Sequence, residues 1–61
     1  MNLEQLLSVT KFGTNISIKT DNMERRFVYD LSINSKSAFI DLLDFSVRFV
    51  HVYDNQLVIE I

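Results

Sequence analysis

The 61-residue chain has no cysteine, no proline and no tryptophan, and it has one glycine, Gly13. Without cysteine it cannot form a disulfide, and one histidine cannot supply the nitrogen and sulfur ligands of a zinc site. One glycine cannot build the glycine-rich loop that cradles a nucleotide phosphate. We therefore expect no cofactor and no metal, and we expect so small a fold to depend on a partner or a second copy for stability.

The chain also lacks an excess of basic residues. Six Lys and Arg residues stand against eight Asp and Glu residues, which gives a net charge of −2 at pH 7. Because nucleic-acid-binding domains usually carry a basic stripe, this balance disfavours nucleic acid as a partner. No apolar run approaches the roughly 20 residues of a membrane span, and the opening MNLEQLL lacks the basic start of a signal peptide. We expect a cytoplasmic protein with no membrane association.

Two short helices are predicted from the apolar spacing. Asn2 and Gln5 are spaced as a capping box, and the leucines that follow recur at helical spacing: Leu3, Leu6 and Leu7. A second helix is expected to begin at Asn34 or Ser35 and to end near Asp44, with an apolar face made of Phe39, Leu42 and Leu43. Helices this short are marginal in isolation, so both are expected to dock on a sheet.

Two β-hairpins are predicted from the alternation of apolar and polar residues. The first joins residues 12–20 to residues 23–31, and the second joins residues 47–53 to residues 57–61 through a three-residue loop, Asp54–Gln56. The prediction is one α+β domain over residues 1–61, a small antiparallel sheet of two hairpins with two short helices, in the order α-β-β-α-β-β. The alternation does not determine how the two hairpins join.

The second hairpin has more apolar residues than one face of a sheet requires. One set is expected to pack under the helices: Val47, Phe49, Tyr53, Leu57, Ile59 and Ile61. The opposite face would then carry Val28, Val50, Val52 and Val58. Because exposed apolar patches usually mark binding sites, this face is predicted to bind a protein partner or to form a homodimer. Arginine and tyrosine are enriched in interface hot spots, which adds four candidate contacts: Arg25, Arg26, Tyr29 and Tyr53.

The remaining polar and aromatic residues give weaker indications. His51 is the one candidate general base, but nothing in the sequence indicates a strained nucleophile turn or an oxyanion hole. We expect a structural histidine and no enzyme, and catalysis through His51 is the third hypothesis.

The seven aromatic residues could stack on nucleobases, yet most fall on predicted core faces: Phe12, Phe27, Tyr29, Phe39, Phe45, Phe49 and Tyr53. The second hypothesis is a small dimeric nucleic-acid-binding or regulatory module that uses a basic spot of Lys19, Arg25 and Arg26.

Two segments carry a family resemblance. LEQLLSVTKFGTNISIKT (residues 3–20) and VYDNQLVIEI (residues 52–61) resemble the ends of small phage or prophage accessory proteins of low-GC Gram-positive bacteria. The order of elements is also similar to that of some small type II anti-CRISPR proteins. This resemblance implies an accessory protein that works in the host cytoplasm by stoichiometric binding, as an inhibitor of a host or defence protein. It assigns no functional residue.

Overall fold

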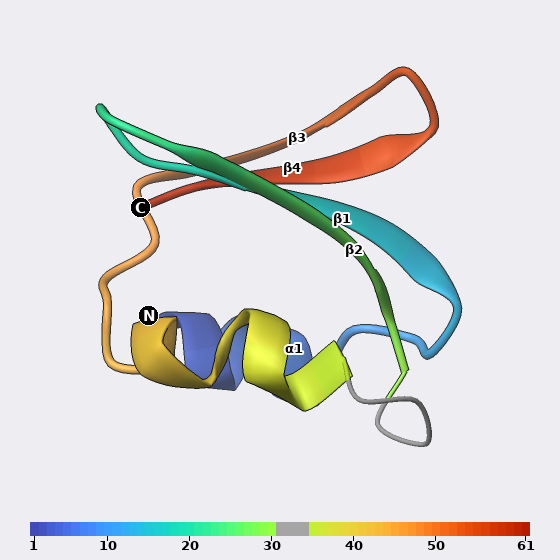
Figure 1. The fold of residues 1–61 in the computed structure, drawn as a ribbon, viewed down its shortest axis with the longest axis horizontal. Helices are drawn as coiled ribbons and strands as arrows, with labels where there is room; N and C mark the ends of the chain where they lie inside the picture. The colour runs from blue at the N-terminus through green and yellow to red at the C-terminus, as the bar shows by residue number, and fades with distance from the viewer. Residues whose placement is uncertain (31–34) are drawn as a thin grey trace.

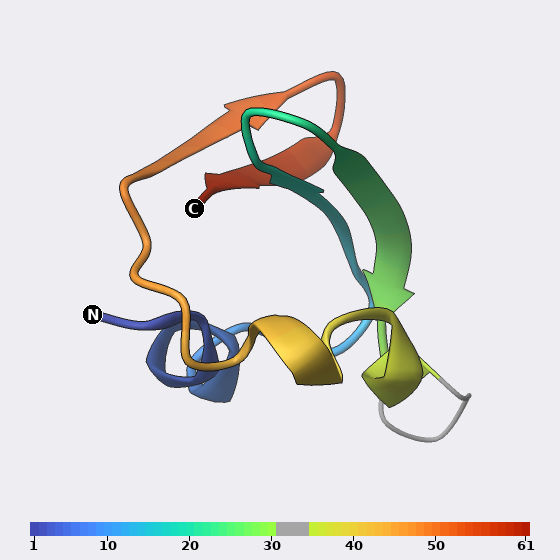
Figure 2. The same cartoon turned by 60° about the vertical axis from the view of Figure 1, so that its left-hand side comes forward.

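A computed structural model of the chain describes residues 1–30 and 35–61. Its elements are helix α1 (Leu3–Ser8), strands β1 (Thr14–Lys19) and β2 (Glu24–Tyr29), the 3-10 segments η1 (Ser35–Ala38) and η2 (Ile40–Leu42), and strands β3 (Phe49–Tyr53) and β4 (Gln56–Glu60). The helical elements lie together beneath one face of the sheet, and the other face is open (Figures 1 and 2). The predicted α+β class is confirmed.

The sheet is mixed, not purely antiparallel as predicted. Its strand order is β2-β1-β4-β3, and the two central strands, β1 and β4, run parallel. Ile16 pairs with Leu57 and Ile18 pairs with Ile59, and the Ile61 amide extends the ladder by donating to the Lys19 carbonyl at 3.0 Å. The central strands β1 and β4 have both edges paired, and they carry the buried residues Ile16, Ile18 and Ile59. Each hairpin is antiparallel, as predicted.

Helix α1 begins with the predicted capping box. The Asn2 side chain accepts a hydrogen bond from the Gln5 amide, and the Gln5 side chain accepts one from the Asn2 amide, both at 2.9 Å. These two bonds satisfy backbone donors that a helix start leaves unpaired. Leu3 and Leu7 are buried on the face that meets the sheet, so a helix of six residues is held by its packing.

The first turn of α1 is also bonded to the chain that precedes β3. The Leu3 amide donates to the Phe45 carbonyl at 2.9 Å, and the Glu4 amide donates to the Leu43 carbonyl at 3.1 Å. An isolated bridge joins Asn2 to Ser46. The amino-terminal helix and the segment that follows η2 therefore form one layer.

The predicted second helix is wrong in type. Instead of one α-helix there are two 3-10 segments, η1 and η2, separated at Phe39. The Leu42 amide bonds to the Phe39 carbonyl at 2.9 Å, a 3-10 spacing, and the Ala38 carbonyl that an α-helix would use accepts instead from the Arg25 guanidinium at 3.0 Å. The predicted cap, Asn34 or the side chain of Ser35, lies outside the part of the chain that the structure describes, as does Leu31.

The core joins the sheet to this helical layer. Its buried members are Leu3, Leu7, Ile16, Ile18, Tyr29, Phe39, Leu42 and Ile59. Phe39 stacks on Phe27 with ring centroids 5.2 Å apart and meets the edge of Tyr29 at 5.7 Å. The apolar face predicted for the second helix is therefore used, although the backbone that carries it is not α-helical.

The turn of the second hairpin differs from the prediction by one residue. Asp54 and Asn55 both have positive φ angles, 53° and 60°, and Tyr53 pairs directly with Gln56. This is the two-residue type I′ connection, whose twist matches that of the flanking strands. The three-residue loop expected from the sequence is wrong. A slip of one residue turns every side chain of one strand to the other face.

The assignment of β3 side chains to faces is therefore wrong as well. Val50 pairs with Ile59 and Val52 pairs with Leu57, so both valines lie on the helix side of the sheet. The three alternate residues, Phe49, His51 and Tyr53, lie on the open face, opposite Glu60, Val58 and Gln56. The four valines predicted to share one face, Val28, Val50, Val52 and Val58, are divided between two.

Candidate functional site

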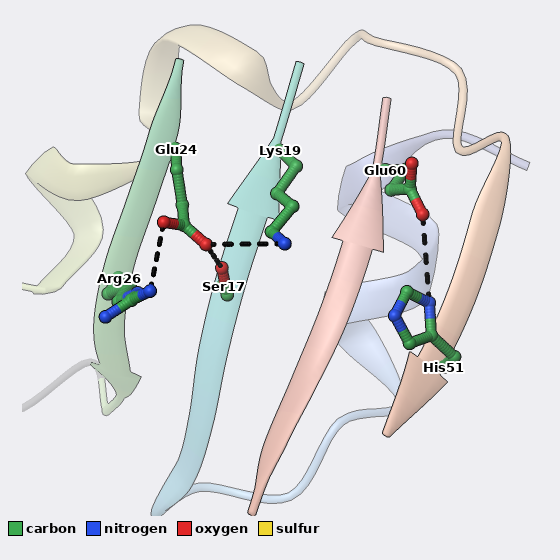
Figure 3. Close-up of polar contacts among 6 residues, drawn as sticks. All are labelled: Ser17, Lys19, Glu24, Arg26, His51 and Glu60. Carbon is green, nitrogen blue, oxygen red and sulfur yellow. Dashed lines mark hydrogen bonds and ion pairs between the residues drawn. The ribbon is translucent and has the colours of Figure 1, made fainter. Parts of the chain in front are cut away.

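The centre of the open face is polar and closely covered by its own side chains. Ser17 is 1% exposed and Val58 is 3% exposed, although no helix of the described residues covers this face. The Ser17 hydroxyl donates to the Glu24 carboxylate at 2.9 Å, across the β1–β2 pair (Figure 3). The middle of this face therefore offers few apolar atoms to a partner.

Glu24 forms ion pairs with two cations on this face. One of its carboxylate oxygens lies 3.1 Å from the Arg26 guanidinium, and the other lies 3.7 Å from the Lys19 ammonium (Figure 3). The hydrogen bond from Ser17 is the main cause that lowers the pKa of Glu24, partly opposed by desolvation, and Arg26 and Lys19 lower it further. Glu24 therefore neutralises the part of the predicted basic spot that Lys19 and Arg26 form.

Arg25 lies on the other face and is engaged with the helical layer. Its guanidinium forms a bidentate pair with Asp41, at 2.7 and 2.9 Å. This hydrogen bonding raises the pKa of Arg25 and lowers that of Asp41. Arg25 therefore closes the β2 side of the sheet against η1 and η2, and it does not join Arg26 in one patch.

The acid dependence of stability follows from these two carboxylates. The ordinary pKa is 4.5 for the side chain of Glu24 and 3.8 for that of Asp41, and folding lowers both pKa values. The unfolded state therefore binds more protons than the folded state in acid. The free energy of unfolding consequently falls as the pH is lowered through this range. We expect the free energy of unfolding of Glu24→Gln to depend less on pH below about pH 4.5 than that of the wild type. Ser17→Ala should show a smaller reduction of the same pH dependence. Urea unfolding between pH 2.5 and 7 measures this. Superimposable acid profiles for Glu24→Gln and the wild type would contradict the prediction.

The eight predicted partner-binding residues do not form one surface. Tyr29 and Val58 are buried, and Arg25 is bonded to Asp41. Val28 and Arg26 are exposed on β2, at the far side of the sheet from β3. Val50, Val52 and Tyr53 are exposed on β3. A partner-binding role for these residues stays a prediction, and β3 is the element that brings three of them together.

Strand β3 is the most exposed apolar element of the sheet. All five of its residues are exposed, with Phe49 at 63%, Val52 at 74% and Tyr53 at 70%. It is an end strand, paired with β4 alone, whereas η1 packs against β2 at the opposite end. Proteins usually protect such an edge with charges, proline or a covering segment, and His51 is the one polar side chain within β3.

The exposure of three phenylalanines, and the face on which Tyr53 lies, were not predicted from the sequence. Phe12, Phe45, Phe49 and Tyr53 are all exposed rather than in the core. For Phe49 and Tyr53 the cause is the two-residue turn, which reverses the faces of β3. Asp and Asn both tolerate the positive φ angles of a type I′ turn. A two-residue turn at Asp54 and Asn55 would therefore have predicted the exposure of Phe49 and Tyr53.

His51 lies beside an acidic residue on the open face. Its Nδ1 atom lies 3.8 Å from a carboxylate oxygen of Glu60 on β4 (Figure 3). Ser17, the buried hydroxyl of this face, is hydrogen-bonded to Glu24 and not to the imidazole. A nucleophile needs a base within hydrogen-bond reach, and the geometry gives Ser17 a carboxylate partner in place of His51. The catalytic hypothesis gains no support from this arrangement.

A shallow depression of about 390 Å³ lies between the two hairpins. Its lining includes Asn15, Arg26 and Val28 from the first hairpin and Asp54 and Gln56 from the second. The charged side chains are of opposite sign, so the depression does not select for a ligand of either charge. The depression contains polar side chains from both hairpins.

Comparison of the chain with protein-family models, with curated proteins and with solved structures gives no match. Within the described ranges, no helix has the length and apolar character needed to cross a membrane. The same residues bring together no group of three or more potential metal-ligating side chains.

Proposed function

We propose that this chain is a small non-enzymatic module that binds another protein stoichiometrically through β3. The observation that carries the proposal is the exposure of the whole strand, with Phe49 and Tyr53 on the open face and Val52 on the other. Aromatic residues supply much of the binding energy at protein interfaces. An apolar strand at the end of a sheet is also a ready acceptor for a further strand.

The resemblance to phage accessory proteins supports a target for this binding. It favours a host or defence protein, which the chain would inhibit by occupying one of its surfaces. The nucleic-acid alternative has less support, because Glu24 lies between Lys19 and Arg26 and because Arg48 lies 3.6 Å from Asp21. Each of these cations has an acidic partner within the chain.

The proposal predicts that the two aromatic residues of β3 carry target binding. The double variant Phe49→Ser, Tyr53→Ser should lose roughly 2 kcal/mol or more of binding free energy, about 30-fold in affinity, as expected for aromatic hot spots. The wild-type chain is first used to recover the target from a lysate of the host organism. The purified target is then titrated with each variant, and calorimetry measures the affinity and the stoichiometry. We expect one target molecule per chain.

A matched control uses exposed aromatic residues elsewhere on the protein. The double variant Phe12→Ser, Phe45→Ser removes two side chains of similar exposure that lie outside β3, and it should keep the wild-type affinity within a few-fold. If both double variants bind equally well, or if only the control variant loses affinity, β3 is not the binding surface.

A further inference from the structure

The sequence of β3 and its flanking residues is symmetric about His51. The segment RFVHVYD, residues 48–54, has a valine on each side of His51, then an aromatic residue on each side. Its ends carry opposite charges, Arg48 and Asp54. A strand with this pattern is complementary to itself when a second copy runs antiparallel beside it, because each residue then meets its symmetric counterpart.

We propose that the outer edge of β3 pairs with β3 of a second copy of this chain, antiparallel, about a two-fold axis through His51. This inference rests on the proposed use of β3 as a binding surface and names the occupant of its edge. The pairing joins two four-stranded sheets into one of eight strands. Phe49 and Tyr53 stay on the open face, where the dimer presents two sets of them to a target.

The backbone geometry permits this register. In a hairpin with a two-residue turn, the residues that flank the turn form a hydrogen-bonded pair, and such pairs alternate with non-hydrogen-bonded pairs. Tyr53 and His51 therefore direct their backbone groups toward β4, and Val52 and Val50 direct theirs to the outer edge. With the axis at His51, Val50 of one copy meets Val52 of the second, so the outward N–H and C=O groups bond in pairs.

The side chains favour this register over its neighbours. With the axis at His51, Val50 packs beside Val52 and Phe49 beside Tyr53. Arg48, which also lies 3.6 Å from Asp21 of its own chain, is opposite Asp54 of the second copy. Moving the axis to Val50 places Val52 opposite Arg48, and moving it to Val52 places Val50 opposite Asp54. Both shifts set a valine against a charge and leave the charges at the ends unmatched. Apolar, aromatic and opposite-charge cross-strand pairs are the favourable ones.

Disulfide capture tests the axis, because the chain has no native cysteine. Residues on the axis form a non-hydrogen-bonded pair with Cα atoms about 4.5 Å apart, within the range of about 4.4–6.8 Å that a disulfide spans. We expect His51→Cys to give mostly covalent dimer on mild oxidation. Asn15→Cys, an exposed position on β1, should give background levels.

The register is tested with two further single-cysteine variants. A mixture of Phe49→Cys and Tyr53→Cys chains of different mass should form the mixed dimer. Each variant alone should crosslink weakly, because identical positions then lie four residues apart along the strand, about 13 Å. Efficient Phe49–Phe49 or Tyr53–Tyr53 crosslinks would overturn the register.

Sedimentation of the wild-type chain completes the test. We expect a dimer whose dissociation constant rises at least tenfold in Val52→Lys and is unchanged in Val28→Lys, the same substitution on β2. A wild-type chain that is monomeric to about 100 μM, with His51→Cys no better crosslinked than Asn15→Cys, would overturn self-pairing. Target binding by the two double serine variants is measured separately, so self-pairing and the proposed function can fail independently.

Discussion

Replacing Ile59 by alanine is expected to lower the free energy of unfolding by about 2–5 kcal/mol, the usual range for removing a large buried aliphatic side chain. Ile59 has no exposed surface and lies on β4, between Ile18 of β1 and Val50 of β3. A chain of this size has roughly 3–9 kcal/mol of stability in total. The substitution should therefore remove a large fraction of the free energy of unfolding.

Urea unfolding followed by circular dichroism measures this loss, at one fixed protein concentration, because any association adds to stability by mass action. Ile40→Ala is the matched control, since it removes the same atoms from η2 at a position that is 54% exposed. Its effect should stay within about 0.5 kcal/mol, as for most surface substitutions. Equal losses at Ile40 and Ile59 would mean that β4 is not central to the core.

Replacing Phe39 by alanine is expected to cost about 3–5 kcal/mol, the range for a buried aromatic residue. Phe39 is buried between η1 and η2 and contacts the rings of Phe27 and Tyr29 on β2. Aromatic pairs in this geometry add about 0.5–1.5 kcal/mol beyond the area that they bury. The substitution therefore removes the main contact between the 3-10 segments and the first hairpin.

The effect of Phe39→Ala should be visible in two measurements. The melting temperature should fall steeply, and hydrogen exchange of the Leu42 amide, which bonds to the residue 39 carbonyl, should become faster than that of the β1 amides. Phe45→Ala, at a position that is about half exposed, is the control and should lose much less. If Phe45→Ala is as damaging as Phe39→Ala, the packing of the helical layer differs from the structure.

Much of the local structure was predictable, because local patterns encode it. The capping box of Asn2 and Gln5 requires only residues three apart in the sequence. The alternation in the first hairpin predicts two paired antiparallel strands, and β1 and β2 pair in that way. The buried side of the second helical region, Phe39 and Leu42, was also correct.

The candidate site was predicted only in part, because it depends on one turn. The sequence predicts a three-residue loop at Asp54–Gln56, whereas the two-residue turn of the structure places Phe49 and Tyr53 on the open face and not in the expected core. Three residues of β3 are among the predicted partner-binding residues, Val50, Val52 and Tyr53, and their binding role stays a prediction. Their division between two faces was missed, because alternation gives a strand's period and not its register with its neighbour.

The sequence by itself determined the α+β class, the two antiparallel hairpins, the first helix with its cap and most of the buried residues. The tertiary structure alone decided three further features. It made β1 and β4 parallel neighbours, it divided the second helical region into 3-10 segments around the Arg25–Asp41 pair, and it left β3 at the end of the sheet. Each of these depends on contacts between residues distant in the chain. A local sequence pattern reports the period and the caps of one element, and it does not report which distant element that element contacts.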